Sequence, residues 1–134
     1  MEMDISFPGG KKVNATYNGF TIETDQPKKD GGEGSAPQPY DLFLSSIGTC
    51  AGIYVVYFCH ERGIDTSDLK MTVRFDSDEK KHLVGAVRIH ISLPPGFPGK
   101  YKSAVIKVAG LCTVKRNIFD PPEFSIEADI QEDK

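Results

Sequence analysis

Three cysteines, Cys50, Cys59 and Cys112, are the candidates for redox or nucleophilic chemistry in this chain of 134 residues. Cys50 lies in the segment Gly48–Gly52, whose small side chains leave room for another element or a substrate to approach the sulfur. Cys59 follows nine residues later, which on a helix places it on the opposite face from Cys50. Because Cys59 follows a run of large apolar residues, we expect it to be packed and inert.

Cys112 lies just ahead of two cations, Lys115 and Arg116. A helix that opens near Gly110 would place Cys112 in its first turn, and a helix N-terminus and nearby cations both stabilise a thiolate. A thiol with the ordinary pKa of about 8.5 is about 3% ionised at pH 7, whereas a pKa two units lower makes about three quarters of it ionised. The spacing leaves two hypotheses open: two separated reactive cysteines, or two buried structural thiols.

Other chemistry has weaker support. The glycine-rich run Gly31–Gly34 lacks the lysine and the Ser/Thr of a phosphate-binding loop, so we interpret it as a flexible loop. His60, His82 and His90 do not have the spacing of metal ligands, so we expect no metal site. A cysteine–histidine hydrolase would need a partner for Cys50 that no motif identifies.

Composition and charge limit the class of protein and its partners. Hydrophobic residues make up 39% of the chain and charged residues 26%, which suits one folded domain over residues 1–134. A net charge of −3 with no basic stripe argues against nucleic acid or an anionic membrane surface as a partner. Few cysteines and no leader-like start indicate a reducing, cytoplasmic location.

The first 38 residues predict strands followed by a loop. Lys12–Tyr17 and Phe20–Thr24 flank Asn18-Gly19, a strong hairpin signal. A shorter strand over Met3–Phe7 precedes them, and Gln26–Gln38 is rich in proline, lysine and glycine, as loops are.

A long helix carries Cys50. We expect it to begin at Pro39, to have Asp41 in its first turn and to end near Glu61 or Arg62, before Gly63. Residues 42–59 carry no formal charge, the lower limit for a membrane span, but Ser, Thr and Gly dilute the run and favour a buried core helix. About 23 residues span about 35 Å, close to the diameter of the domain. One small sheet cannot cover such an apolar helix all round, so we predict a homodimer.

The second half alternates strands with short helices. Leu69–Ser77 and His82–Leu93 each predict a strand with one buried and one wet face. Tyr101–Val108 and Leu111–Ile118 predict short helices, and Glu123–Ile130 predicts a closing strand. This order indicates an α+β fold rather than a parallel βαβ fold.

In the surroundings of two cysteines the sequence resembles the OsmC/Ohr family of thiol-dependent hydroperoxide reductases. The resemblance is densest over Ser35–Ala51, which matches the Pro-led helix that carries the family's first cysteine. Cys112-Thr113-Val114 matches its second cysteine, which is followed by a small residue and Val. The resemblance implies an OsmC-like fold, with antiparallel sheets wrapped around a long buried central helix in an intertwined homodimer.

The same resemblance implies a mechanism. Cys50 would be the peroxidatic cysteine, whose thiolate attacks an organic hydroperoxide, releases an alcohol and becomes a sulfenic acid. Cys112 would be the resolving cysteine, which forms a disulfide with Cys50. An external dithiol, such as a lipoylated protein, would restore both thiols, so no metal, flavin or haem is implied.

The chain departs from the Ohr branch in the groups that activate the cysteine. That branch uses an arginine from the N-terminal strands and a glutamate ten residues before the cysteine, a position that Tyr40 occupies here. The N-terminal segment offers lysines but no arginine, and a lysine lacks the planar fork of a guanidinium. The candidate auxiliary residues are Arg116, Lys11, Lys12 and Asp41.

Three functions follow as hypotheses. The first is a Cys50/Cys112 peroxidase that acts on organic hydroperoxides. The second is a protein on the same scaffold that binds an apolar small molecule without peroxidase activity. The third is another thiol–disulfide reaction.

Overall fold

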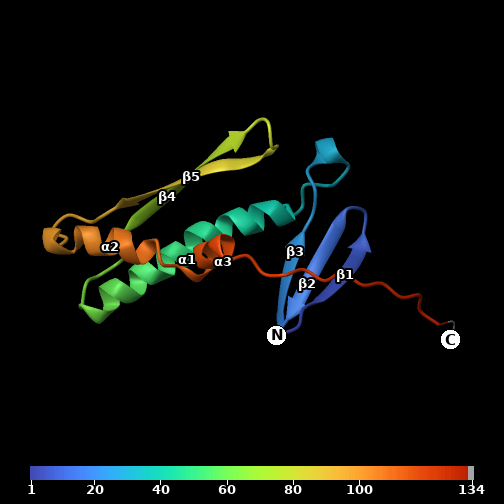
Figure 1. Cartoon of the computed structure of the whole chain (residues 1–134), viewed down its shortest axis with the longest axis horizontal. Helices are drawn as coiled ribbons and strands as arrows, with labels where there is room; N and C mark the ends of the chain where they lie inside the picture. Colours follow the sequence, from blue (N-terminus) through green and yellow to red (C-terminus); the bar gives the residue numbers. More distant parts are fainter. Residues whose placement is uncertain (133–134) are drawn as a thin grey trace. The chain divides into compact units, whose positions relative to one another are not determined.

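The computed structural model describes residues 1–132, which form an α+β fold of antiparallel strands and one long helix (Figure 1). Two compact units make up the chain: Met1–Thr49 with Met71–His90, and Cys50–Lys70 with the chain from Ile91 onward. The strands are β1 (Asp4–Gly9), β2 (Lys12–Tyr17), β3 (Phe20–Thr24), β4 (Lys70–Asp78) and β5 (Leu83–Ser92). The helices are α1 (Pro39–Glu61), α2 (Lys102–Ala109), α3 (Thr113–Phe119) and the short 3-10 turns η1 (Lys28–Asp30) and η2 (Gly99–Tyr101).

The three-stranded sheet β1-β2-β3 is antiparallel and confirms the predicted hairpin. Asn18 and Gly19 join β2 to β3 with φ values of 45° and 80°. Two consecutive left-handed residues form the turn whose twist matches that of the flanking strands. The edge strand β1 extends two residues further than expected, with a register shift between Ser6 and Gly9 around Pro8, which has no N–H to donate.

α1 has the predicted bounds and ends where a left-handed glycine follows. Gly63 has φ of 65° and its N–H bonds the carbonyl of His60 at 3.1 Å, as at many helix C-termini. The buried residues of α1 form one stripe at helical spacing: Ile47, Ala51, Val55, Phe58 and Cys59.

Within one chain, α1 is not covered on all sides, in agreement with the expectation that one small sheet cannot cover it all round. Only 28% of the residues in its apolar stretch of 18 residues are buried, because the elements of a single chain pack against one stripe. Of the helices in residues 1–132, α1 is the one whose length and composition would allow it to cross a membrane.

The hairpin β4-β5 confirms the predicted strands to within one or two residues, but only β4 shows the expected alternation. Met71, Val73 and Phe75 are half-buried there, and the intervening Thr72 and Arg74 are exposed. In β5, by contrast, Val87 and Ile89 are 41% and 36% exposed, because one chain covers neither face of this strand fully.

Gly48 allows β4 to approach α1 closely. A Cβ atom at this position would lie 2.8 Å from Cγ2 of Val73, closer than real side chains pack. Valine is stiff at χ1 and cannot easily move away. The absence of a side chain at Gly48 therefore determines how near β4 lies to the helix, two residues before Cys50.

In the second unit, the later half of α1 packs with α2 and the start of α3. Ala51, Val55, Val105 and Ala109 are at most 6% exposed. Near the end of α1, the rings of Phe58 and Tyr101 pack edge to face at 5.6 Å, and the Arg62 guanidinium lies 3.7 Å from the centre of the Phe58 ring.

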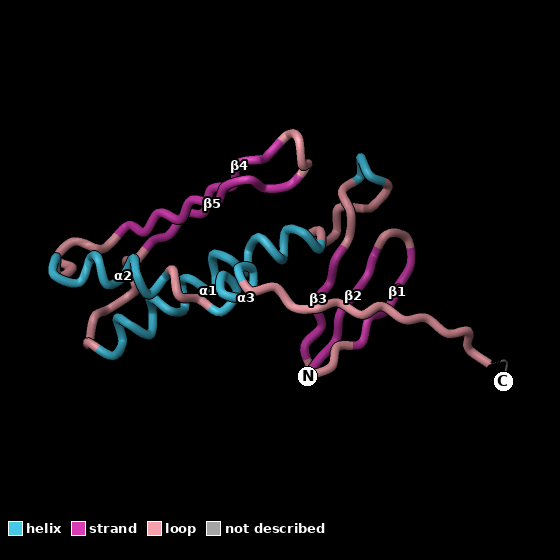
Figure 2. The backbone as a smooth tube through the Cα atoms, in the orientation of Figure 1, coloured by secondary structure: helices cyan, strands magenta, loops and turns pink. Residues whose placement is uncertain are grey.

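The prediction of a closing strand over Glu123–Ile130 is wrong for the single chain. This segment forms no strand and is drawn as a loop in Figure 2. Its apolar residues Phe124, Ile126 and Ile130 are 85%, 92% and 95% exposed. Alternating residues form a strand only beside another strand that pairs with their N–H and C=O groups, and in residues 1–132 no strand pairs with this segment.

The loop before α1 is tied down rather than flexible, which corrects the interpretation of Gly31–Gly34. Asp25 is 1% exposed, and its carboxylate accepts hydrogen bonds from the N–H of Gln26 at 2.7 Å and from both the N–H and the hydroxyl of Ser35 at 3.0 and 2.6 Å. Gly32 passes so close that a Cβ atom would lie 2.0 Å from the carbonyl oxygen of Gln26. The Asp25 carboxylate thereby fixes the path of the chain into α1.

We predict that Asp25→Asn lowers the melting temperature by several degrees at pH 7. The hydrogen bonds to Ser35 hold the pKa of Asp25 at about 2, below its usual 3.8. A lowered pKa in the folded state stabilises the fold above about pH 4, and this contribution is lost as the pH falls towards 2. Thermal melts between pH 2 and 7 measure the effect.

The matched control is Asp30→Asn, a substitution of an exposed carboxylate in the same loop. It is expected to leave the melting temperature and its pH dependence close to wild type. Equal acid sensitivity of wild type and Asp25→Asn between pH 4 and 2 would contradict the proposed role of the carboxylate.

Candidate functional site

Cys50 lies on α1 at the edge of the buried stripe and is half-buried. Its neighbour Ala51 is fully buried, and one helical residue corresponds to a rotation of about 100°, so the Cys50 sulfur lies beside the core rather than within it. Tyr54 follows four residues later, on the same face of the helix as Cys50.

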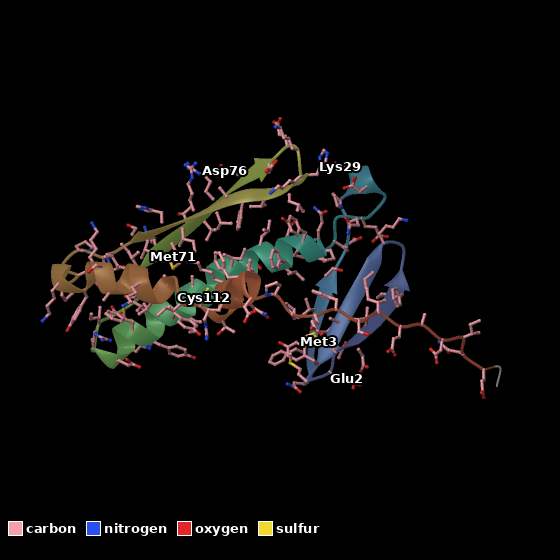
Figure 3. All side chains as sticks on the ribbon, viewed as in Figure 1. Glu2, Met3, Lys29, Met71, Asp76 and Cys112 are labelled. Carbon is pink, nitrogen blue, oxygen red and sulfur yellow. The ribbon has the colours of Figure 1, made fainter. Side chains whose placement is uncertain are left out.

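Cys112 lies directly before α3, not inside its first turn as expected (Figure 3). It is the N-cap residue with extended backbone angles, φ −61° and ψ 148°, and its carbonyl accepts the first helical hydrogen bond, from Arg116 N–H at 3.0 Å. The helix begins two residues later than expected, because a turn at Gly110 and Leu111 precedes it. Cys112 is 1% exposed.

Arg116 connects α3 to the part of α1 that carries Cys50. Its Nη2 donates to the hydroxyls of Tyr54 and Thr113, each at 3.2 Å, and its Nε donates to the carbonyl of Leu111 at 3.1 Å. The Tyr54 and Thr113 hydroxyls also bond each other at 2.8 Å. The guanidinium is thus held by groups from both helices, and its partner on α1, Tyr54, is one helical turn after Cys50.

The electrostatics of Tyr54 reflect this arrangement. The hydrogen bonds from Thr113 and Arg116 lower the pKa of Tyr54, against the opposing effects of burial and of a charge on Cys50. The Cys50 sulfur is therefore near enough to Tyr54 for the charges of the two groups to act on each other. Tyr54 is thus influenced by both Arg116 and Cys50.

The other predicted auxiliary residues belong to the first unit, whereas Cys50, Cys112 and Arg116 belong to the second. Lys12 forms an ion pair with Glu33 at 3.0 Å, and this hydrogen bond and charge raise the pKa of Lys12. Lys11, in the turn between β1 and β2, lies beside the loop that precedes α1, with its Cε 3.5 Å from the position that a Cβ atom on Gly31 would take. Asp41 is exposed in the first turn of α1.

Sequence reasoning missed Tyr54 as a member of the site. Its spacing of four residues from Cys50 was the available signal, because residues four apart share a helix face. The contact with Arg116 spans 62 residues of sequence and depends on tertiary packing. Among residues 1–132, no group of three or more His, Cys, Asp or Glu side chains is placed to hold a metal ion.

Comparison with known proteins gives the class to which this fold and its cysteines belong. Residues 32–127 match the model of the OsmC-like protein family. This match covers most of the chain, including both Cys50 and Cys112, and the chain therefore belongs to the OsmC-like family. No curated protein matches the chain.

Solved structures share the fold at low sequence identity. A putative osmotic stress induced and detoxification response protein from Psychrobacter arcticus 273-4 has a TM-score of 0.74 and 21% identity, over 86% of this chain and 85% of its own. An OsmC-like protein from Mycoplasma pneumoniae has a TM-score of 0.67 and 16% identity, over 90% of this chain and 89% of its own. An organic hydroperoxide resistance protein OsmC from Legionella pneumophila has a TM-score of 0.55 and 19% identity, over 88% of this chain and 89% of its own.

Cys59 behaves as the packed thiol expected from its position. It is 1% exposed, and burial raises the pKa of its thiol. We predict that alkylation of Cys59 by iodoacetamide in the native protein at pH 7 is at least about ten-fold slower than that of Cys50, since the thiolate is the reactive form. Mass spectrometry of the alkylated peptides measures both rates in one sample.

Cys59→Ala provides the second measurement, and it should change the free energy of unfolding by about 1–2 kcal/mol at most. Faster alkylation of Cys59 than of Cys50 would show that the reactive thiol has been assigned to the wrong residue of α1.

Proposed function

We propose that this chain is a thiol-dependent peroxidase that reduces organic hydroperoxides to alcohols, with Cys50 as the peroxidatic and Cys112 as the resolving cysteine. The observation that carries the proposal is the hydrogen bonding of the Arg116 guanidinium to Thr113 and to Tyr54, which is one helical turn after the half-buried Cys50. Membership of the OsmC-like family supports it, as does the fold shared with the hydroperoxide resistance protein of Legionella pneumophila.

The first step consumes the peroxide. The Cys50 thiolate attacks the distal oxygen of ROOH, a sulfur–oxygen bond forms and the oxygen–oxygen bond breaks. The leaving alkoxide takes a proton and departs as the alcohol ROH, and Cys50 becomes a sulfenic acid. A fixed cation beside the sulfur stabilises both the thiolate and the charge that develops on the leaving oxygen.

Arg116 is suited to this role because part of its fork is not used by the protein. Nε and Nη2 make the contacts to Leu111, Tyr54 and Thr113, and in the hydrogen bonds found within residues 1–132 Nη1 is not engaged. A guanidinium is rigid and planar, so anchoring one edge also orients the other. Nη1 is then available to a peroxide oxygen.

The remaining steps restore the thiols. The Cys112 thiolate attacks the sulfenic sulfur of Cys50, water leaves and a disulfide forms. An external dithiol, such as a lipoylated protein, then reduces this disulfide and is itself oxidised, so the sum is ROOH plus dithiol giving ROH, water and the oxidised dithiol. The cycle needs no metal or organic cofactor and suits a reducing, cytoplasmic location. Lys11, Lys12 and Asp41 are auxiliary candidates in this proposal, with Lys12 already paired to Glu33.

The proposal includes an intertwined homodimer with sheets wrapped around the central helices. Large apolar side chains of α1 are exposed in the single chain, with Phe43 46%, Ile53 41% and Tyr57 60% exposed. The segment over Phe124–Ile130 keeps its alternating pattern without a neighbouring strand. A second copy would cover the helix and supply an edge for this segment, because monomeric proteins rarely expose apolar surface of this extent.

The peroxidase prediction is tested with reduced protein and cumene hydroperoxide. One equivalent of peroxide per chain should be consumed, with a loss of two hydrogens, about 2 Da, as the disulfide forms. Cys50→Ser should abolish consumption, and Cys112→Ser should stop at a Cys50 sulfenic acid that dimedone traps. Cys59→Ala is the matched control and should react as wild type.

Persistent consumption in Cys50→Ser would refute the assignment. Unreactive thiols together with a co-purified ligand in native mass spectrometry would indicate the binding protein instead. Thiol transfer without any peroxide reduction would indicate another thiol–disulfide reaction.

The dimer prediction is tested by sedimentation equilibrium, which should give twice the chain mass of 14.7 kDa at micromolar concentration. Ile126→Asp should weaken dimerisation about ten-fold or more, because it places a charge on the apolar face of the segment. Ser125→Asp adds the same charge on the opposite face and should leave the dimer intact. A monomeric wild type would contradict this part of the proposal.

A further inference from the structure

We infer that Tyr54 and Thr113 are positioning residues, which hold the Arg116 guanidinium on the face of α1 that carries Cys50. The inference deepens the proposed function and rests on it, since the position of Arg116 matters most if Cys50 is the reacting thiol. It assigns a role to two hydroxyl groups that lie on different helices.

The hydrogen bonds show how the guanidinium is fixed. Arginine has donors and no acceptor, so the Tyr54 and Thr113 oxygens must both accept from Nη2. Each hydroxyl keeps its own proton, and one of these protons makes the 2.8 Å hydrogen bond between the two oxygens. The result is a closed triangle of Arg116, Tyr54 and Thr113, in which every side is a hydrogen bond.

The three anchors of Arg116 are not equivalent. Thr113 and Leu111 lie within five residues of Arg116 and orient its side chain relative to α3. Tyr54 is the hydrogen-bond partner on α1, so it alone of the three ties the cation to the helix of Cys50. An exposed arginine without such an anchor loses little by rotating into water, because its side chain gains rotamer entropy.

Tyr54 also lies on the same face of α1 as Cys50, about one helical turn further along. The two residues are four apart on α1, and long side chains in helices point back towards the N-terminus, so the ring of Tyr54 leans over the turn of Cys50. A charge on Cys50 opposes the lowering of the Tyr54 pKa, in agreement with this placement.

Other charged groups near this face are few. Around the start of α3 the titratable or charged residues are Cys112, Lys115 and Arg116; on this face of α1 they are Cys50, Tyr54 and, one turn further on, Tyr57. Lys115 points elsewhere, with its Nζ 5.8 Å from the centre of the Phe119 ring and 3.5 Å from the Cβ position of Gly110. Arg116 is therefore the cation that the Tyr54 hydroxyl brings to this site.

The test is the pH dependence of Cys50 alkylation by iodoacetamide, followed by mass spectrometry of the Cys50 peptide in full-length reduced protein. Tyr54→Phe removes only the hydroxyl and should slow alkylation at pH 7 by about five-fold, as displacement of a nearby cation would. Near pH 10, well above the ordinary thiol pKa of about 8.5, the rates should converge. Arg116→Gln should show the same pattern with at least the same loss.

Two variants separate positioning from a general loss of structure. Tyr57→Phe removes a hydroxyl from an exposed tyrosine two helical turns after Cys50, which makes no hydrogen bond to Arg116 within residues 1–132, and should keep the wild-type profile. Thr113→Val should lose rate at pH 7, and Thr113→Ser, which retains the hydroxyl, should restore it. A merely structural effect would not disappear at high pH.

The outcomes also separate this inference from the proposed function. If wild type consumes no peroxide but Tyr54→Phe and Arg116→Gln still slow alkylation at pH 7, the peroxidase proposal fails and the positioning role stands. If peroxide is consumed while Tyr54→Phe matches wild type in both the alkylation profile and the peroxide rate, the positioning role is overturned. An Arg116→Gln profile identical to wild type overturns it as well.

Discussion

The buried stripe of α1 is the constraint on which the rest of the structure depends. The helix is apolar on nearly every side, so the residues that face the packed interior determine its rotation about its own axis. Ala51 and Val55 are fully buried, and this turns the neighbouring row of Cys50 and Tyr54 towards the edge of the core. A half-buried sulfur and a hydroxyl that meets α3 both follow from this rotation.

Elements whose limits depend on local chemistry could be predicted from the sequence. The hairpin at Asn18-Gly19 needs two left-handed residues, and α1 begins at a proline and ends before a left-handed Gly63. Elements that depend on neighbours far away in the sequence could not be predicted in this way. Glu123–Ile130 has a strand pattern, but no strand pairs with it in residues 1–132, and β5 has an alternating pattern without a covered face.

The candidate site divides in the same way. Cys50, Cys112 and Arg116 could be chosen because thiols and cations have recognisable chemistry and spacing. Tyr54 was not chosen with them: its spacing of four residues from Cys50 indicates a shared helix face, but its contact with Arg116 comes from packing between α1 and α3. The loop before α1 was misjudged for a related reason: its glycines suggested freedom, whereas Gly32 provides space beside the hydrogen bonds of Asp25.

Which cation could act on Cys50 depends on which cations already have an acidic partner in the structure. Lys12 is engaged by Glu33, next to a loop whose conformation depends on the Asp25 carboxylate, and a lysine offers only one point of charge. Arg116 differs because its fork has two edges, so that one can be anchored while the other stays free. Nε and Nη2 hold the side chain through Leu111, Thr113 and Tyr54, and the anchoring geometry itself orients Nη1. A contact between two helices thus brings an arginine to the Tyr54 side chain, one helical turn after Cys50, in a chain whose N-terminal segment has no arginine.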